Sequence, residues 1–157
     1  MLDENKFAQY GFPRSESDIL GITIHETGNV DMNAQEVEDY LNNECKTSAG
    51  YHYVVDKDEI IQLMPDDWAV YHTGKGKDFG CRYTIAVSVC SSLNDDDYNE
   101  AQAKMIELIK ALQLEHDIEN DMVFFHQDFN QKSFCPKTIL TRYGTSKNFA
   151  YQELRED

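Results

Sequence analysis

The chain has 157 residues, of which 41% are hydrophobic and 11% aromatic, with only eight glycines and three prolines. This length and composition are typical of one folded domain and exclude a low-complexity chain. The 14 basic and 29 acidic residues give a net charge of −15, which argues against a nucleic acid or an anionic membrane as partner. We therefore expect a single domain over residues 1–157 and a monomer.

The first half of the chain predicts a helix and several strands. The segment up to Asp18 has no clear pattern and is expected to be irregular. The apolar run ILGITI at 19–24 predicts a buried strand, and Asn33 is placed to cap a helix that ends near Asn43. Residues 51–55 and 60–64 predict two strands joined by a hairpin turn.

The second half continues the mixture of strands and helices. YTIAVSVC at 83–90 and MVFFH at 122–126 predict two more strands. Between them, residues 98–116 have the apolar period of a long helix. Pro136 is placed to begin a short helix through Leu140, and a terminal helix is expected over 147–156. The order predicts an α/β (α+β) fold with helices around one sheet.

No apolar run approaches the roughly 20 residues of a membrane helix. The opening MLDENKFAQYGF lacks the basic and apolar regions of a signal peptide, so the chain is expected to be cytoplasmic as synthesised. The four cysteines are therefore expected to be free thiols.

Two histidines and one cysteine are candidate metal ligands. His25 and His126 each follow a predicted buried strand, where side chains are held rigidly at the edge of a sheet, and Cys135 comes nine residues after His126. Zinc binds imidazole nitrogen and thiolate, and a catalytic site leaves its fourth position to water. The spacing alone also allows two hydrogen-bonded histidines and a buried structural cysteine, because no HExxH or CxxC motif is present.

Five short motifs occur in an order that resembles a known family. They are IHETGN at 24–29, AGYHYVVD at 49–56, AVYHTG at 69–74, TIAVSVC at 84–90, and HQD followed by CP between 126 and 136. Together they resemble the type-2 N-acetylmuramoyl-L-alanine amidases. That superfamily includes phage lysozyme-type amidases, cytoplasmic anhydromuropeptide amidases and peptidoglycan recognition proteins. The resemblance covers about residues 19–140.

The resemblance implies a fold and a cofactor. The fold is a central mixed β-sheet flanked by helices, as in peptidoglycan recognition proteins, with zinc in a groove. Carried over motif by motif, His25, His126 and Cys135 would be the zinc ligands. The implied reaction cleaves the amide between N-acetylmuramic acid and the L-alanine of the stem peptide, so peptidoglycan or a released muropeptide would be the substrate.

The resemblance also implies which residues act on the substrate. Tyr51 matches the catalytic tyrosine of the family. In phage-type relatives a lysine lies two residues before the cysteine. Here Lys132 lies three before Cys135, and Ser133 lies two before it. We expect Lys132 to stabilise the oxyanion, with Ser133 as the alternative. His72 and Trp68 are expected to line the substrate groove. Relatives that use a glutamate base carry it where this chain has Ser88, so a glutamate-base mechanism is not expected.

The cysteine ligand and the missing glutamate favour a phage or prophage endolysin, which would reach the cell wall after holin-type release. A cytoplasmic muropeptide-recycling amidase and a non-catalytic peptidoglycan-binding module are the alternatives. A cysteine hydrolase with Cys135 or Cys90 as nucleophile is a third.

Overall fold

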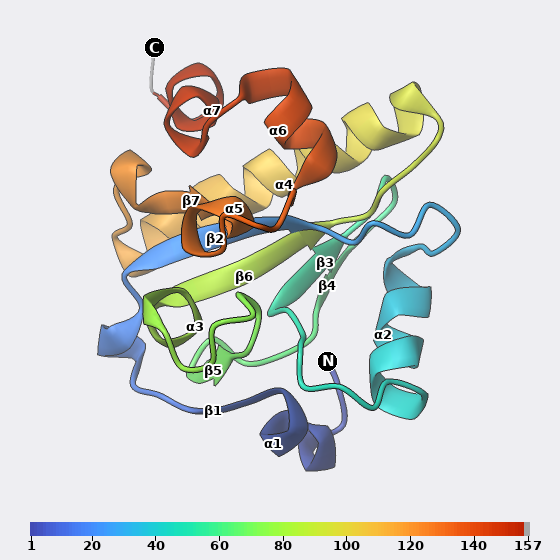
Figure 1. The fold of residues 1–157 in the computed structure, drawn as a ribbon, viewed down its shortest axis with the longest axis vertical. Helices are drawn as coiled ribbons and strands as arrows, with labels where there is room; N and C mark the ends of the chain where they lie inside the picture. The colour runs from blue at the N-terminus through green and yellow to red at the C-terminus, as the bar shows by residue number, and fades with distance from the viewer. Residues whose placement is uncertain (156–157) are drawn as a thin grey trace.

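The computed structural model describes residues 1–155 and is built around a five-stranded mixed sheet (Figure 1). The strands follow the order β4 (Ile60–Gln62), β3 (Tyr53–Val55), β6 (Thr84–Val89), β2 (Gly21–Glu26) and β7 (Val123–Phe125). The last four are parallel, and the edge strand β4 is antiparallel to β3. This confirms the predicted mixed sheet and the hairpin between 53 and 62.

One face of the sheet carries the larger hydrophobic core. Alternate side chains of a strand point to the same face, so Ile22 and Ile24 of β2 lie beside Ile85, Val87 and Val89 of β6. The helices that cover this face are α4 (Asp95–His116), α6 (Lys137–Tyr143) and α7 (Ser146–Glu153) (Figure 1). Within residues 1–155, no helix combines the length and apolar character needed to cross a bilayer.

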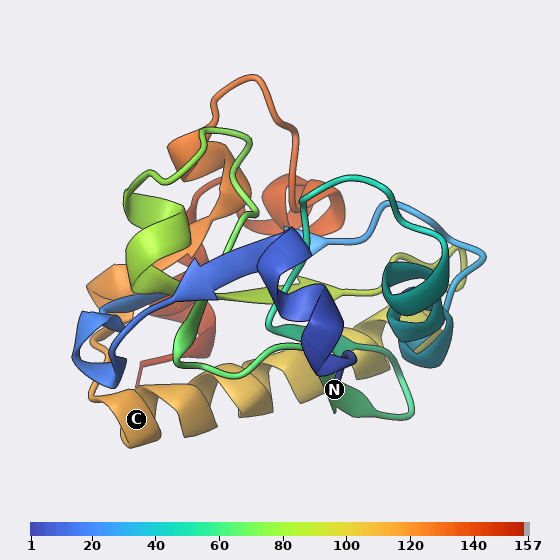
Figure 2. The ribbon, with the colours of Figure 1, turned by 90° about the horizontal axis from the view of Figure 1, so that it is seen from below.

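The opposite face is more polar near its centre. Thr23 and His25 of β2 share it with Thr84 and Ser88 of β6, and the Thr23 and Thr84 hydroxyls are 2.7 Å apart. A second apolar cluster covers the rest of this face. It is formed by α1 (Phe7–Tyr10), α2 (Ala34–Asn43) and the ribbon of β1 (Gly11–Pro13) with β5 (Trp68–Val70), which lie on this side of the sheet (Figure 2).

Side-chain caps decide where the two main helices begin. Asn33 accepts a hydrogen bond from the Glu36 amide in a capping box, as the sequence predicts for α2. Asn94 accepts from the Asp97 amide, so α4 begins at Asp95, three residues before its predicted start. The acidic residues of this first turn suit the positive end of the helix.

The N-terminal segment corrects one prediction. Residues 1–18 were expected to be irregular, yet they contain η1 (Glu4–Lys6), α1, β1 and η2 (Glu16–Asp18). Their order depends on partners far along the chain, because β1 pairs with β5. Three further short helices and one strand were also not predicted, namely α3 (Phe79–Tyr83), η3 (Asn120–Met122), α5 (His126–Phe129) and β5. The predicted terminal helix ends earlier, at Glu153, and its last predicted residue lies outside the described range.

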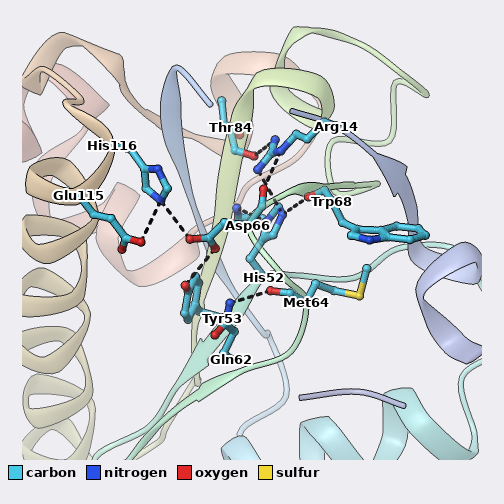
Figure 3. A network of polar contacts seen from close by, with 11 residues as sticks. Arg14, His52, Tyr53, Gln62, Met64, Asp66, Trp68, Thr84, Glu115 and His116 are labelled. Carbon is cyan, nitrogen blue, oxygen red and sulfur yellow. Dashed lines mark hydrogen bonds and ion pairs between the residues drawn. The ribbon is translucent and has the colours of Figure 1, made fainter. Parts of the chain in front are cut away.

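Arg14 connects this N-terminal segment to the main sheet (Figure 3). Its guanidinium donates to the carbonyl oxygens of Asp66, Arg82 and Thr84 at 2.9, 3.0 and 2.8 Å. Burial lowers the pKa of Arg14 to about 10, so the side chain is still charged at neutral pH. His52 lies beside it and is also structural, since its Nε2 donates to the Trp68 carbonyl at 2.6 Å.

Replacing Arg14 by Lys should destabilise the fold. The lysine ammonium, at the end of a flexible side chain, cannot donate to three carbonyl oxygens in the planar geometry of the guanidinium. At least one of these carbonyls therefore loses its hydrogen bond. We expect the free energy of unfolding to fall by about 1–3 kcal/mol. Urea unfolding followed by circular dichroism measures this. The matched control is Arg155→Lys at an exposed position, and equal stability of the two variants would contradict the role of Arg14.

Candidate metal centre and active site

The three predicted metal ligands lie together although they come from distant parts of the chain. His25 is on β2, one residue before its end, and is only 2% exposed. His126 begins the short helix α5 (His126–Phe129) directly after β7, and Cys135 lies in the loop before α6. Their ligand atoms all lie within 4.8 Å of one another. The carboxyl ends of neighbouring parallel strands bring the two histidines to the same edge.

Hydrogen bonds determine which nitrogen of His25 faces the cluster. His72 Nε2 lies 2.9 Å from the Gly80 carbonyl, which can only accept, so this nitrogen carries the hydrogen. Burial lowers the pKa of His72 to about 4, so the ring is neutral and its Nδ1 accepts. His25 Nε2, 2.9 Å away, must therefore donate to it. The lone pair of His25 Nδ1 is left facing Cys135 Sγ at 3.8 Å.

Thr73, the residue after His72, accepts a hydrogen bond from the second histidine, His126. His126 Nε2 lies 3.0 Å from the Thr73 carbonyl and donates to it. The side-chain amide of Asn130 donates to the same oxygen at 3.1 Å. Nδ1 of His126 therefore carries the lone pair that faces the cluster, where the Ser133 hydroxyl also approaches it. Metal-binding histidines usually donate their other ring N–H in this way, and here the consecutive residues His72 and Thr73 receive both bonds.

Cys135 completes the cluster. Burial raises the pKa of its thiol to about 11, while the backbone N–H of Glu26, 3.4 Å from Sγ, opposes that rise. Burial also holds the pKa of His25 well below its ordinary value, so that ring is a neutral ligand at pH 7. Two imidazole nitrogens and one sulfur that converge in this way fit the preference of zinc for nitrogen and thiolate ligands.

Tyr51 lies beside the cluster, with the centroid of its ring 5.2 Å from the centroid of the His25 ring. Burial raises the pKa of Tyr51 to about 12, so its phenol stays protonated and can donate a hydrogen bond. Tyr51 also lines a cavity of about 380 Å³ that includes Thr27 and Asn29 after β2, and Val37 and Leu41 of α2. Tyr51 is therefore next to a predicted metal ligand and also lines this cavity.

Ser88 is a polar group at this site to which the sequence analysis assigned no role. It pairs with His25 across β2 and β6, so both side chains point to the same face. Its hydroxyl is buried and lies close enough to the Tyr51 phenol to oppose the rise of the Tyr51 pKa. Ser88 therefore places a second hydroxyl beside Tyr51, on the face of the sheet that carries His25.

Lys132 and Ser133, the two candidates for stabilising the oxyanion, differ in their surroundings. Ser133 is half-buried, and its hydroxyl lies 3.4 Å from His126 Nδ1. Lys132 is exposed and makes no hydrogen bond or ion pair within the described residues. The structure thus brings Ser133 to the cluster and leaves the Lys132 side chain exposed to solvent.

The two predicted groove residues occupy unexpected places. His72 is 4% exposed and lies behind His25, so its contacts are those of a support for the cluster. Trp68 packs edge-on against Phe7 of α1, with ring centroids 5.5 Å apart. These contacts favour a packing role for Trp68. The AVYHTG motif does not indicate which of its side chains face a substrate, so a groove role for this segment stays a prediction.

Comparisons with known proteins identify the family of the chain. The family described as N-acetylmuramoyl-L-alanine amidase matches residues 15–138. The N-acetylmuramoyl-L-alanine amidase XlyA of Bacillus subtilis (strain 168) is 33% identical over 130 residues, which are 82% of this chain and 43% of XlyA. CwlA of the same organism, another N-acetylmuramoyl-L-alanine amidase, is 36% identical over 122 residues, 76% of this chain and 44% of CwlA. The chain thus spans less than half the length of these curated relatives.

Solved structures resemble the fold over nearly their whole length. The catalytic domain of XlyA superposes with a TM-score of 0.78 at 30% identity, covering 90% of this chain and 91% of that domain. PlyL gives a TM-score of 0.82 at 23% identity, with 95% and 92% covered, which bears on the fold alone. The family match, the relatives and the fold confirm the resemblance drawn from the motifs, and the chain belongs to the N-acetylmuramoyl-L-alanine amidase family.

Proposed function

We propose that the chain is the catalytic unit of a zinc-dependent N-acetylmuramoyl-L-alanine amidase of endolysin type. Its substrate would be bacterial peptidoglycan, cleaved at the amide between N-acetylmuramic acid and L-alanine. The observation that carries the proposal is the convergence of His25, His126 and Cys135, with hydrogen bonds that direct the Nδ1 lone pair of each histidine into the cluster. The amidase names of XlyA and CwlA support the reaction.

The chain's own residues have distinct tasks in this reaction. When bound, zinc would supply a Lewis acid and lower the pKa of a water molecule towards neutrality. Tyr51, protonated at neutral pH, would donate a hydrogen bond to the carbonyl oxygen of the substrate as negative charge develops there. The Ser88 hydroxyl, which lies beside the Tyr51 phenol, would help to orient that phenol.

Zinc content and activity should both depend on Cys135. We expect about one zinc per chain in the wild type. Cys135→Ser should lower the zinc affinity and reduce amidase activity more than about a hundredfold, because the site loses its anionic ligand. Elemental analysis measures the zinc, and new L-alanine amino termini on purified peptidoglycan measure cleavage. Because the Cys135 thiol must lose its proton to bind a metal, the zinc affinity should rise with pH.

The control for this prediction is Cys90→Ala, which changes a buried core cysteine outside the cluster and should keep its zinc. Wild-type protein that cleaves peptidoglycan without zinc, or a Cys135→Ser variant with full activity, would contradict a zinc amidase. Loss of activity on thiol alkylation in a zinc-free protein would instead indicate a cysteine nucleophile.

The oxyanion-stabilising group can be assigned by two single substitutions. We propose that the exposed ammonium of Lys132 approaches the developing oxyanion when substrate binds. Lys132→Met should then lower kcat by about 10²–10³ and change KM little. Ser133→Ala should have a much smaller effect on kcat. Steady-state kinetics on a soluble muropeptide measure both variants, and the reverse pattern would assign the role to Ser133.

The contact between His72 and His25 yields a third prediction. His72→Phe removes the acceptor for His25 Nε2–H and should weaken zinc binding by about 10–100-fold. The amide oxygen of Asn can take the place of Nδ1, so His72→Asn should retain more affinity. Competition with a chromophoric chelator measures both. If His72 instead contacts substrate only, both variants will bind zinc like the wild type and differ in KM.

A further inference from the structure

Glu26 is a buried carboxylate that the mechanism above does not use. It ends β2 directly after His25 and, by strand alternation, points to the opposite face, into the core beneath α4. Its side chain accepts four hydrogen bonds. Tyr98 Oη and the Thr138 backbone N–H bind Oε1 at 2.9 Å, and the Ser91 and Thr138 hydroxyls bind Oε2 at 2.7 and 3.1 Å. No basic side chain of residues 1–155 forms an ion pair with it.

The hydrogen bond to the Thr138 amide replaces the N-terminal side-chain cap that α6 lacks. Helices usually begin with a side chain that accepts a hydrogen bond from an amide of the first turn. The residue before α6 is Pro136, whose side chain has no acceptor, and no cap of this kind is present. Glu26 accepts the amide of Thr138 instead, from a strand more than a hundred residues earlier in the chain.

The backbone of Glu26 holds the same loop at its other end. Its N–H donates to Cys135 Sγ at 3.4 Å. Glu26 therefore contacts the Cys135 sulfur through its backbone N–H. Its side chain contacts Thr138, three residues after Cys135, in the first turn of α6. The backbone N–H of Gln127 also donates to the Cys135 carbonyl, at 3.1 Å, so the loop keeps one anchor when Glu26 is changed.

We propose that Glu26 is a positioning residue that fixes the separation of His25 and Cys135 by holding the first turn of α6 against the end of β2. This inference rests on the metal centre proposed above. The bond to Tyr98 serves a different purpose, because it ties β2 to α4 and does not involve the Cys135 loop. Loss of that bond should cost stability without moving the sulfur.

The first test compares the affinity for Co²⁺, whose thiolate charge-transfer absorption reports the Cys135–metal bond. Glu26→Ala should weaken Co²⁺ binding at least about tenfold and reduce that absorption. Glu26→Gln can still accept from the Thr138 amide with its oxygen and donate to the Ser91 and Thr138 hydroxyls, so it should stay within about threefold of the wild type. Tyr98→Phe, the matched control, should bind Co²⁺ like the wild type.

The second test needs no metal. In metal-free protein, hydrogen exchange of the peptide 135–143 should be faster in Glu26→Ala and unchanged in Glu26→Gln and Tyr98→Phe. Co²⁺ affinity of Glu26→Ala within twofold of the wild type, or an equal loss in Tyr98→Phe or Glu26→Gln, would overturn the proposal. Unchanged exchange in Glu26→Ala would also overturn it. Failure of the wild type to bind Co²⁺ would overturn the metal centre itself, and the exchange experiment would still decide the role of Glu26.

Discussion

The alternation of side chains along β2, held in register by β6, is the constraint on which both the core and the site depend. Ile22 and Ile24 point into the apolar layer beneath α4, while Thr23 and His25 point to the other face. A shift of one residue would exchange the two sets, burying an imidazole among apolar side chains and placing isoleucines at the site. The hydrophobic core therefore fixes the direction in which His25 points.

Burial gives the site its chemical character. Removal from water holds His25 neutral and Tyr51 protonated, so that one offers a lone pair and the other a hydrogen. The same burial disfavours the Cys135 thiolate until a cation compensates for its charge. The chain carries a net charge of −15, yet His25, Tyr51 and Cys135 at the centre of the site are neutral in the absence of metal.

Much of this arrangement could be predicted from the sequence. Apolar runs and caps located the five strands of the main sheet and the long helices, and five ordered motifs identified the family and the three clustered residues. Contacts between distant segments could not be predicted, because no local pattern records them. Examples are the pairing of β1 with β5, the placement of His72 behind His25, and the cap that Glu26 supplies to α6. Trp68 shows the same difficulty, since an aromatic residue near a motif can face either the groove or the core.

His72 and Thr73 are consecutive in the chain, yet each supports a different histidine of the cluster. Because one peptide bond joins them, a displacement of this segment would alter the supports of both imidazoles. If the cluster binds a metal as proposed, a molecule that displaces this segment would change the affinity for the metal. By thermodynamic reciprocity, the metal would then change the affinity for that molecule by the same factor. The occupancy of the proposed metal centre and the conformation of the 72–73 segment would thus be coupled.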